Sequence, residues 1–355
     1  MPRKRVIYQS EALFTGPTGS NATTAANNKQ LNRVQSINYN FEITRQDINQ
    51  FGNLAAIDRI ILEQPTVALD FTYYANSGEN ESNIGLAVGS GTASTSALSH
   101  ILTGRADTDP KNYYILTAPE GSDANVVGWT VANGRTIGLG NVNLTSYQLE
   151  ASVGEIPTVT VNAEALNMNF VNATSGTQNP AVNPTDGTAV SAGFTLPTPV
   201  SGDGFSALRP GDIAIDLNNG VLGLSESDLK IQSATVSVEI ARDPIEKLGS
   251  RFAFTKEITF PVTATMSFDA VVGDTTAASL ADVLSNDSNY TLSLTLKRPD
   301  GAGKALKYTL KKAKLDSQDF SSSIGDNKSV SLQFSAQVGG PNDTSAGLFI
   351  DGPHA

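Results

Sequence analysis

Few side chains in this chain of 355 residues could perform acid–base or nucleophilic chemistry. The sequence holds no cysteine and two histidines, His100 and His354, so thiolate metal sites and cysteine nucleophiles are excluded. A Ser–His–acid set needs a histidine held by a partner. His100 lies in a segment of helical spacing whose later counterpart carries Asp282, and His354 is the second-last residue. We therefore expect no enzyme, no cofactor and no metal site.

Weaker motifs point the same way. The run Asp107-Thr108-Asp109-Pro110-Lys111-Asn112 could offer oxygens to Ca²⁺, but it lacks the glycine and distal glutamate of an EF-hand. A loop between a helix and a strand is the favoured interpretation. Gly138-Leu139-Gly140 lacks the third glycine of a dinucleotide site. Paired carboxylates for glycoside hydrolysis stay open on spacing alone, and nothing singles out a pair.

Charged residues give two further candidates. Glu42 and Arg45 recur as Glu239 and Arg242, and an ion pair or loop anchor at the end of a strand is favoured over a ligand role. Five lysines lie close together, at 304, 307, 311, 312 and 314, in a stretch that alternates like a half-buried strand. A solvated strand face or a contact with an acidic neighbour is favoured there over nucleic acid, because no aromatic stacking platform is interleaved.

These candidates belong to an internal repeat. Val34-Gln35-Ser36 returns as Ile231-Gln232-Ser233, and the match continues at one constant offset, without a gap, to Phe71 and Phe268. The rest of the repeat follows at shorter offsets, because the first copy carries insertions: Leu98 matches Leu280, and Leu144 matches Leu315. A fixed spacing indicates a duplicated unit, and insertions are tolerated best in loops.

The repeat predicts the elements that position the charged pairs. Residues 34–43 and 65–73 alternate apolar and polar side chains, as do their counterparts, so each pair predicts two antiparallel strands with one buried face. A long polar connection joins them, over 44–56 and 241–253. Helical spacing follows at 93–103 and 275–285. Two strands joined by a hairpin turn end each copy, at 142–165 and 313–336.

The predicted fold class is all-β and mainly antiparallel, with two tandem β-sandwich or barrel domains, each carrying one short α-helix and a long inter-strand loop. Residues 1–170 form the first domain, in which 1–32 are an N-terminal arm and first strand. Residues 171–210 are a linker, 211–338 form the second domain, with its first strand near 211–217, and 339–355 are a tail. No apolar stretch approaches the length of a membrane span, so no membrane insertion is expected.

The net charge of −11 is unevenly spread. Residues 33–170 carry six basic against fourteen acidic residues, whereas 229–338 carry thirteen basic against twelve acidic ones. The two copies have diverged in charge while keeping their framework.

The opening Tyr8-Gln9-Ser10-Glu11-Ala12-Leu13-Phe14-Thr15-Gly16-Pro17, the stretch from Arg45 to Gly52 and the run Ile60 to Tyr74 resemble tail tube (major tail) proteins of tailed bacteriophages. The resemblance is strongest over 5–85. It implies a structural subunit whose domains form a six-domain ring with a continuous inner β-barrel, and rings that stack into a conduit for DNA. Because this chain carries two copies, three chains would build one pseudo-sixfold ring, and a ring with one chain at each of six positions is the alternative that the sequence leaves open.

The resemblance also implies sites and partners. The long loops match the position of the loop used between stacked rings, which gives as candidate stacking residues Arg45, Asp47, Gln50, Phe51, Gly52, Arg242, Asp243, Lys247 and Gly249. Lys307, Lys311 and Lys312 are candidates for a charged assembly strand. The implied partners are the chain itself, other tail proteins (tape measure, baseplate or tip, terminator) and DNA as non-specifically conducted cargo. The implied location is the virion, after assembly in the cytoplasm of a bacterial host. The alternative is a β-sandwich binding module of a phage or cell surface, for receptor or glycan.

Overall fold

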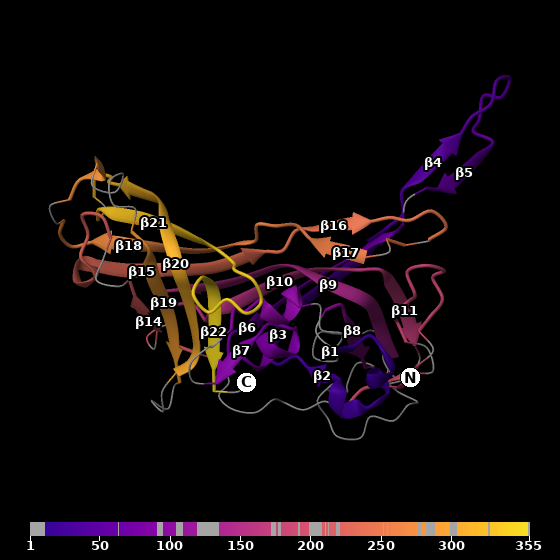
Figure 1. The fold of residues 1–355 in the computed structure, drawn as a ribbon, viewed down its shortest axis with the longest axis horizontal. Helices are drawn as coiled ribbons and strands as arrows, with labels where there is room; N and C mark the ends of the chain where they lie inside the picture. The colour runs from indigo at the N-terminus through magenta and orange to yellow at the C-terminus, as the bar shows by residue number, and fades with distance from the viewer. Residues whose placement is uncertain are drawn as a thin grey trace.

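The computed structural model describes residues 11–62, 64–90, 95–103, 109–118, 135–171, 175–176, 179–190, 192–198, 208–209, 211, 213–217, 221–250, 252–253, 255–275, 278–281, 288–298, 304–325 and 327–353. Most of these residues are in strands (Figure 1). The predicted all-β, mainly antiparallel class is confirmed.

The strands of the first part of the chain are β1 (Glu11–Pro17), β2 (Lys29–Gln30), β3 (Val34–Glu42), β4 (Arg45–Ile48), β5 (Asp58–Ile61), β6 (Thr66–Tyr74), β7 (Val88–Ser90), β8 (Lys111–Thr117), β9 (Arg135–Ser152), β10 (Thr158–Ala165), β11 (Asn167–Val171), β12 (Ser175–Gly176) and β13 (Phe194–Thr195). Those of the second part are β14 (Ile213–Asp216), β15 (Leu229–Glu239), β16 (Arg242–Ile245), β17 (Thr255–Ile258), β18 (Thr263–Val272), β19 (Tyr290–Lys297), β20 (Lys304–Ser321), β21 (Ser329–Gln337) and β22 (Gly347–Gly352). The helices are α1 (Glu79–Asn83) and α2 (Ser99–Leu102), with 3₁₀ turns at Ser20–Thr23, Ala25–Asn27 and Glu226–Asp228.

Eight strands form a central sheet in the order β3-β6-β10-β9-β15-β18-β21-β20. Four strands come from each repeat, and the two sets meet where β9 pairs with β15. Two cover sheets pack against one face of the central sheet. The first is β2-β1-β8-β9-β11 and the second is β14-β19-β20-β22-β7. Alternation along the inner strands β6, β10, β15 and β21 gives one buried and one exposed face, as the sequence predicts.

The two repeats share their irregularities as well as their strands. The β3–β6 pairing skips Gln35, and the β15–β18 pairing skips Gln232, its counterpart in the repeat. The β9–β10 pairing skips Thr145, and the β20–β21 pairing skips its counterpart Asp316. A bulge re-aims the strand that carries it, so matching bulges in both aligned blocks show that the repeat aligns in space. The domain boundaries proposed above stay predictions.

Strands β9 and β20 each run through two sheets. Their first halves lie in the cover sheets and their second halves in the central sheet. Each bends at a residue with positive φ, Asn141 at 54° and Lys312 at 54°. The sequence predicts the second halves as separate final strands and, for β20, a strand around the lysines of its first half, but not that the halves are continuous. It misses β8 and β19, which pair with the first halves.

Two segments that the sequence places outside the two domains contain packed structure. The segment 339–355, expected as a tail, contains β22, whose six residues are all buried between β20 and β7. The expected linker 171–210 contributes Phe194, which stacks on Tyr114 with ring centroids 4.8 Å apart.

The predicted helices and first strands are only partly matched. The helix expected over 93–103 is Ser99–Leu102 in its described part, and α1 was not predicted. In the second copy, residues 280–281 are helical and 282–287 lie outside the described residues. The strand expected at 211–217 is confirmed as β14, whereas residues 6–10 of the first expected strand are outside the described part.

Candidate assembly surfaces

The exposed face of the central sheet is polar, and its middle contains no basic residue. We call this surface the polar face. Its members alternate with the buried residues on all eight strands: Ser36, Asn38, Asn40, Asp70, Thr72, Ser146, Gln148, Glu150, Thr160, Asn162, Ser233, Thr235, Ser237, Thr265, Ser267, Asp269, Ser317, Asp319, Ser331 and Gln333. Residues that face one another in a ladder point to the same side of a sheet, so these side chains form one surface across both repeats.

Three lysines of the second repeat border the polar face, and one of them, Lys256 of β17, donates to Glu164 Oε2 at 3.0 Å near the end of β10. Lys230 is opposite Val271 at the start of β15, and Lys314 is opposite Ser335 where β20 enters the central sheet. They lie at opposite ends of the strands. Between these ends, the charged side chains of the polar face are therefore acidic.

Hydrogen bonds between neighbouring strands order the polar face. Asn38 Nδ2 donates to Asp70 Oδ2 at 2.6 Å. In the second repeat, Ser233 Oγ and Ser331 Oγ both donate to Asp269, at 2.7 and 2.6 Å. Asp70, Glu150, Asp269 and Asp319 give this face negative charge, so it would repel a polyanion over most of its area.

The two edges of the central sheet, β3 and the second half of β20, expose apolar side chains that their repeat counterparts bury. Phe41 is 57% exposed and Phe320 is 48% exposed, whereas the corresponding Val238 and Leu149 are 1% and 0% exposed. The counterparts are buried because β15 and β9 pair with each other inside the chain. Among the described residues, β3 pairs only with β6, and the second half of β20 pairs only with β21. Unpaired edges of this kind are templates for another strand.

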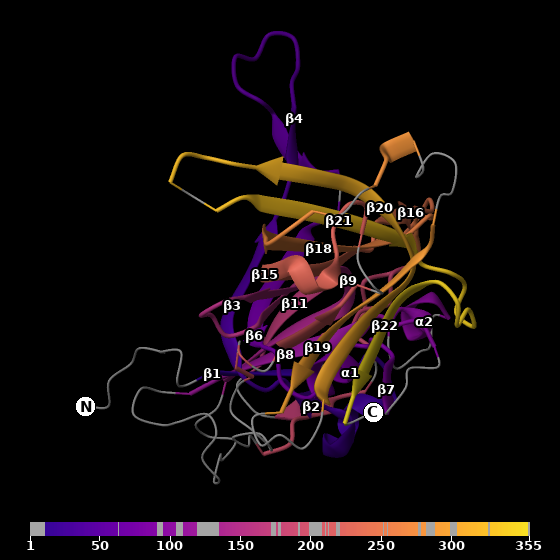
Figure 2. The same ribbon diagram turned by 90° about the vertical axis from the view of Figure 1, so that its left-hand side faces the viewer.

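The loops expected at 44–56 and 241–253 are the ends of two β-hairpins, β4–β5 and β16–β17. Both extend from the same end of the central sheet, because β3 and β15 run in the same direction and lead directly into them (Figure 1). Hairpin β4–β5 projects beyond the rest of the molecule (Figure 2). The structure thus brings the nine predicted stacking residues together in two groups: Arg45, Asp47, Gln50, Phe51 and Gly52 in the first hairpin, and Arg242, Asp243, Lys247 and Gly249 in the second. Whether they stack rings stays a prediction.

The hairpin tips are more apolar than the sequence prediction of a polar loop implies. Phe51, Leu54 and Leu248 are fully exposed. Gly52 and Gly249 turn the chain at φ values of 88° and 85°, a region that favours glycine. Exposed apolar side chains gathered on a projecting element are typical of a contact surface.

Arg242 differs from the other candidate stacking residues because it is buried. Its Nη2 donates to Asp109 Oδ2 at 2.8 Å, and the two side chains are 6% and 8% exposed. Its Nε and Nη1 donate to the carbonyls of Leu144 and Lys256. The prediction of a loop anchor at the end of a strand is therefore correct for Arg242, although its acidic partner is Asp109 of the first repeat and not Glu239. Asp109 is thereby used in an ion pair.

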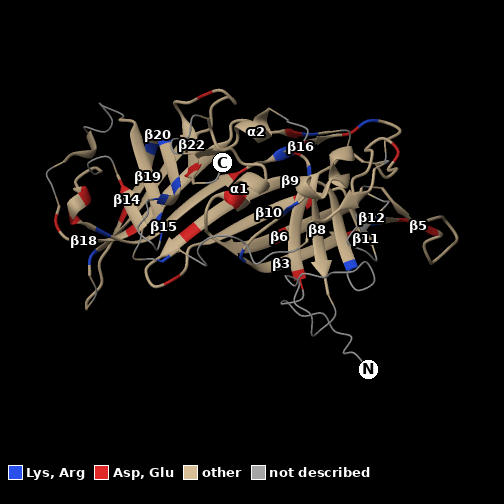
Figure 3. Ribbon diagram, turned by 90° about the horizontal axis from the view of Figure 1, so that it is seen from below, with Lys and Arg blue, Asp and Glu red and all other residues tan. Residues whose placement is uncertain are grey.

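The predicted lysine strand lies in the middle of the second cover sheet, where Figure 3 shows basic residues on β20. Lys311 Nζ donates to Thr344 O at 3.1 Å and lies 3.9 Å from the ring centroid of Phe349. Lys312 Nζ donates to Ser345 Oγ at 2.9 Å. Lys307 is opposite Asp351 of β22. These lysines contact residues 344–351 of the same chain, and this half of β20 has a strand on both sides, so it offers no free edge.

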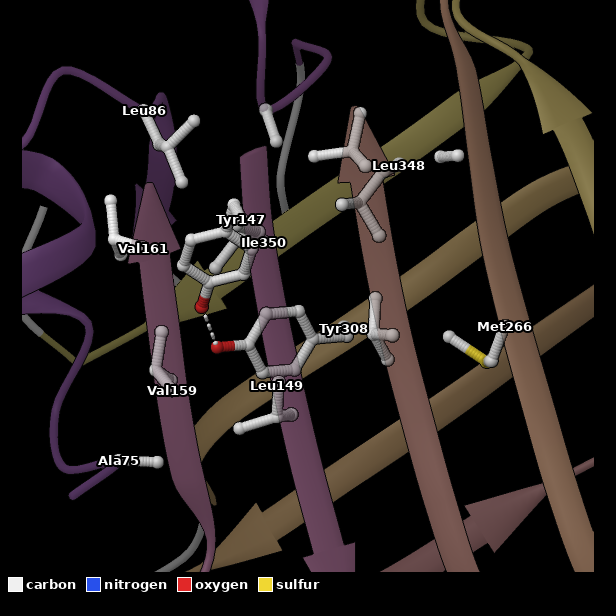
Figure 4. Close-up of a cluster of buried hydrophobic side chains, with 14 of the residues drawn as sticks. Ala75, Leu86, Tyr147, Leu149, Val159, Val161, Met266, Tyr308, Leu348 and Ile350 are labelled. Carbon is white, nitrogen blue, oxygen red and sulfur yellow. Dashed lines mark hydrogen bonds between the residues drawn. The ribbon is translucent and has the colours of Figure 1, made fainter. Parts of the chain in front are cut away.

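A buried carboxylate joins the two repeats, and no sequence pattern pointed to it. Glu81 of α1 is 1% exposed and accepts hydrogen bonds from Tyr73 and Tyr147, at 2.9 and 3.1 Å. Tyr147 and Tyr308 share a further hydrogen bond of 2.6 Å between β9 and the second cover sheet (Figure 4). Burial raises the pKa of Glu81, and it raises the pKa of Tyr308 well above its usual value.

Within the described residues there is no helix long and apolar enough to cross a membrane. In the same part of the chain, no group of three or more His, Asp or Glu side chains is placed to hold a metal ion.

Comparison with known proteins gives little. No protein-family model and no curated protein matches the chain. Among solved structures, the chain is similar at 12% identity to one described as "Cryo-EM structure of the anti-feeding prophage (AFP) baseplate, 6-fold symmetrised", over 40% of this chain and 93% of that chain, with a TM-score of 0.25. A likeness at this level supports no conclusion about function.

Proposed function

We propose that this protein is a self-assembling structural subunit that closes into rings through the edges of its central sheet, and that stacked rings form a tube of the bacteriophage tail type for the passage of DNA. The observation that carries the proposal is the contrast in burial at equivalent positions. Phe41 and Phe320 are exposed at the edges of the chain, whereas their counterparts Val238 and Leu149 are buried at the seam between the repeats.

The internal seam supplies the geometry of the proposed contact between chains. At the seam, Val236 is opposite Leu149 and Ser237 is opposite Gln148. Tyr39 and Asn40 are the repeat counterparts of Val236 and Ser237, and Phe320 and Asp319 are those of Leu149 and Gln148. If two chains pair as the seam does, Tyr39 is opposite Phe320 of a neighbouring chain, and Asn40 is opposite its Asp319. Every chain has one edge of each kind, so the same pairing can continue until a ring closes and no edge is left unpaired. Three two-repeat chains would give six quasi-equivalent units.

The polar face supports the conduit. In a closed ring the cover sheets lie on one side of the central sheet, and the polar face is the side left uncovered to line the channel. Acidic and neutral side chains there would repel phosphates and let a duplex slide. Under this proposal the partners are other copies of the chain, further tail proteins at the ends of the tube, and DNA as cargo, in the virion.

Cysteine cross-linking tests the ring, because the chain has no cysteine of its own. Residues directly opposite each other in an antiparallel ladder have Cα atoms about 4.5–5.5 Å apart, which suits a disulfide. We expect the variant Asn40→Cys/Asp319→Cys to form covalent species of up to three chains under mild oxidation, and negative-stain micrographs to show hollow rings or tubes.

The matched control moves one cysteine by one residue. In Asn40→Cys/Gln318→Cys the second thiol points to the opposite face of the sheet, so no cross-link is expected. Equal cross-linking of both variants would contradict the register. A monomer with no rings, even at high concentration, would favour the second candidate function, a receptor- or glycan-binding module.

A further inference from the structure

We infer that a cavity at the seam between the repeats receives the tip of hairpin β4–β5 from a second copy of this chain. This inference rests on the proposed function, and it assigns the contact by which one ring would hold the next. The cavity has a volume of about 220 Å³. Its apolar lining comes from Val153 after β9, Ile213 and Ile215 of β14, and Leu229 and Ile231 of β15, and polar residues such as Ser152 and Gln232 complete it.

The cavity and the hairpins lie at opposite ends of the molecule. Leu229 and Ile231 begin β15, whereas hairpin β16–β17 follows its last residue, Glu239. Strand β3 runs in the same direction and leads into β4. In Figure 1 the hairpins are at the right, and β14 with the start of β15 is at the left. A projection at one end and a cavity at the other make a head-to-tail contact, and contacts of this kind build open filaments.

The tip of β4–β5 suits the cavity better than the tip of β16–β17. Residues 49–57 carry no charge and expose Phe51 and Leu54 completely. Among the described residues that line the cavity, only Glu226 is charged. The amides of residues 49, 50 and 53 can donate hydrogen bonds to this carboxylate, whereas the tip of β16–β17 carries Glu246 and Lys247, two charged groups whose burial would cost desolvation. We therefore assign Phe51 as the side chain that fills the cavity.

Cross-linking between rings tests the assignment. We expect Phe51→Cys/Ile215→Cys to give covalent species larger than three chains under mild oxidation. The matched control, Leu248→Cys/Ile215→Cys, uses the exposed tip residue of the other hairpin and should give none. Cross-linking of the Leu248 pair without the Phe51 pair would overturn the assignment.

A variant that leaves the ring edges untouched separates this inference from the proposed function. Phe51→Ser should still form rings, because β3 and β20 are unchanged. It should raise the protein concentration needed for tubes on the order of tenfold, because a buried aromatic side chain is lost from every contact. Rings together with tubes of normal length at the wild-type concentration would overturn the inference and leave the proposed function standing. Absence of rings from the wild type would count against the proposed function itself.

Discussion

Arg242 stabilises the chain through one buried ion pair between the repeats. Replacing it by methionine would leave Asp109 buried, with Asn143 as its remaining side-chain donor in the described part of the chain. Breaking a buried pair from one side typically costs about 3–5 kcal/mol. We expect Arg242→Met to lower the free energy of unfolding by roughly that amount, measured by urea denaturation.

The control is the ion pair across hairpin β4–β5. Arg59 and Asp47 lie 2.6 Å apart, but their side chains are 67% and 50% exposed. Exposed pairs contribute only about 0–1 kcal/mol, so Arg59→Met should cost less than Arg242→Met. Similar losses in both variants would show that Arg242 does not anchor the second hairpin.

Glu81 should make stability depend on pH. Burial raises its pKa from an ordinary value of 4.5, so the folded chain holds this proton more tightly than the unfolded chain does. The free energy of unfolding contributed by this group is therefore greatest below the unfolded pKa, and it falls as pH rises through the interval up to the folded pKa. We expect Glu81→Gln to gain stability relative to the wild type as pH rises from about 4 to about 8.

Urea denaturation at several pH values measures this difference. Glu79→Gln, on the exposed side of the same helix, controls for the loss of one charge from α1. A difference between wild type and Glu81→Gln that stays constant across the pH range would contradict the prediction.

At the scale of the elements, the bend of β20 depends on one residue in the left-handed region. Lys312 has a φ of 54°, as does Asn141 at the equivalent position of β9. Asparagine adopts this conformation readily, whereas a β-branched residue does so at a cost of about 1–2 kcal/mol. We expect Lys312→Val to be less stable than Lys312→Asn by that amount in thermal or urea unfolding. Both variants lose the hydrogen bond to Ser345, so equal stabilities would exclude strain at the bend.

The bend also shows what the sequence could predict. The repeat placed β3, β6, β10, β15, β18 and β21 because each alternates apolar and polar residues against a core. It did not reveal that β9 and β20 continue through Asn141 and Lys312 into a second sheet, because a left-handed residue interrupts the alternation. The sequence predicts a tail where β22 lies, because the burial of this strand depends on β7, which belongs to the first repeat and is distant in sequence.

The sequence predicts some features of the candidate surfaces and misses those that depend on contacts between distant segments. The positions of the hairpins followed from the repeat, and their candidate residues are indeed grouped there. The burial of Arg242 and the Glu81 cluster depend on contacts between the two repeats, such as those of Asp109 and Tyr308, that no local pattern records. The lysine pattern of β20 predicts a solvated strand face, because the partners of these lysines at 344–351 fall within the predicted tail.

At the scale of the whole molecule, charge is divided between the two sides of the central sheet. The polar face carries Asp70, Glu150, Asp269 and Asp319 on both repeats, and most lysines of β20 lie in the second cover sheet. Although the two repeats differ in net charge, the middle of the polar face is therefore acidic in both repeats. Under the proposed function this side is the channel wall, and its charge should decide whether DNA is held or released.

Replacing the four acidic residues by lysine tests the channel. Because phosphate binding by lysines releases counterions, we expect tubes of the Asp70→Lys/Glu150→Lys/Asp269→Lys/Asp319→Lys variant to co-sediment with a short linear DNA duplex at low salt and to lose it as salt rises. The corresponding Asn and Gln variant keeps the shape of the face without added positive charge, and it should bind little DNA, as should wild-type tubes. A closed circular plasmid has no end to enter a channel, so the lysine tubes should not retain it. Retention of the plasmid as strongly as the linear duplex would place the polar face on the outside of the assembly and contradict the conduit.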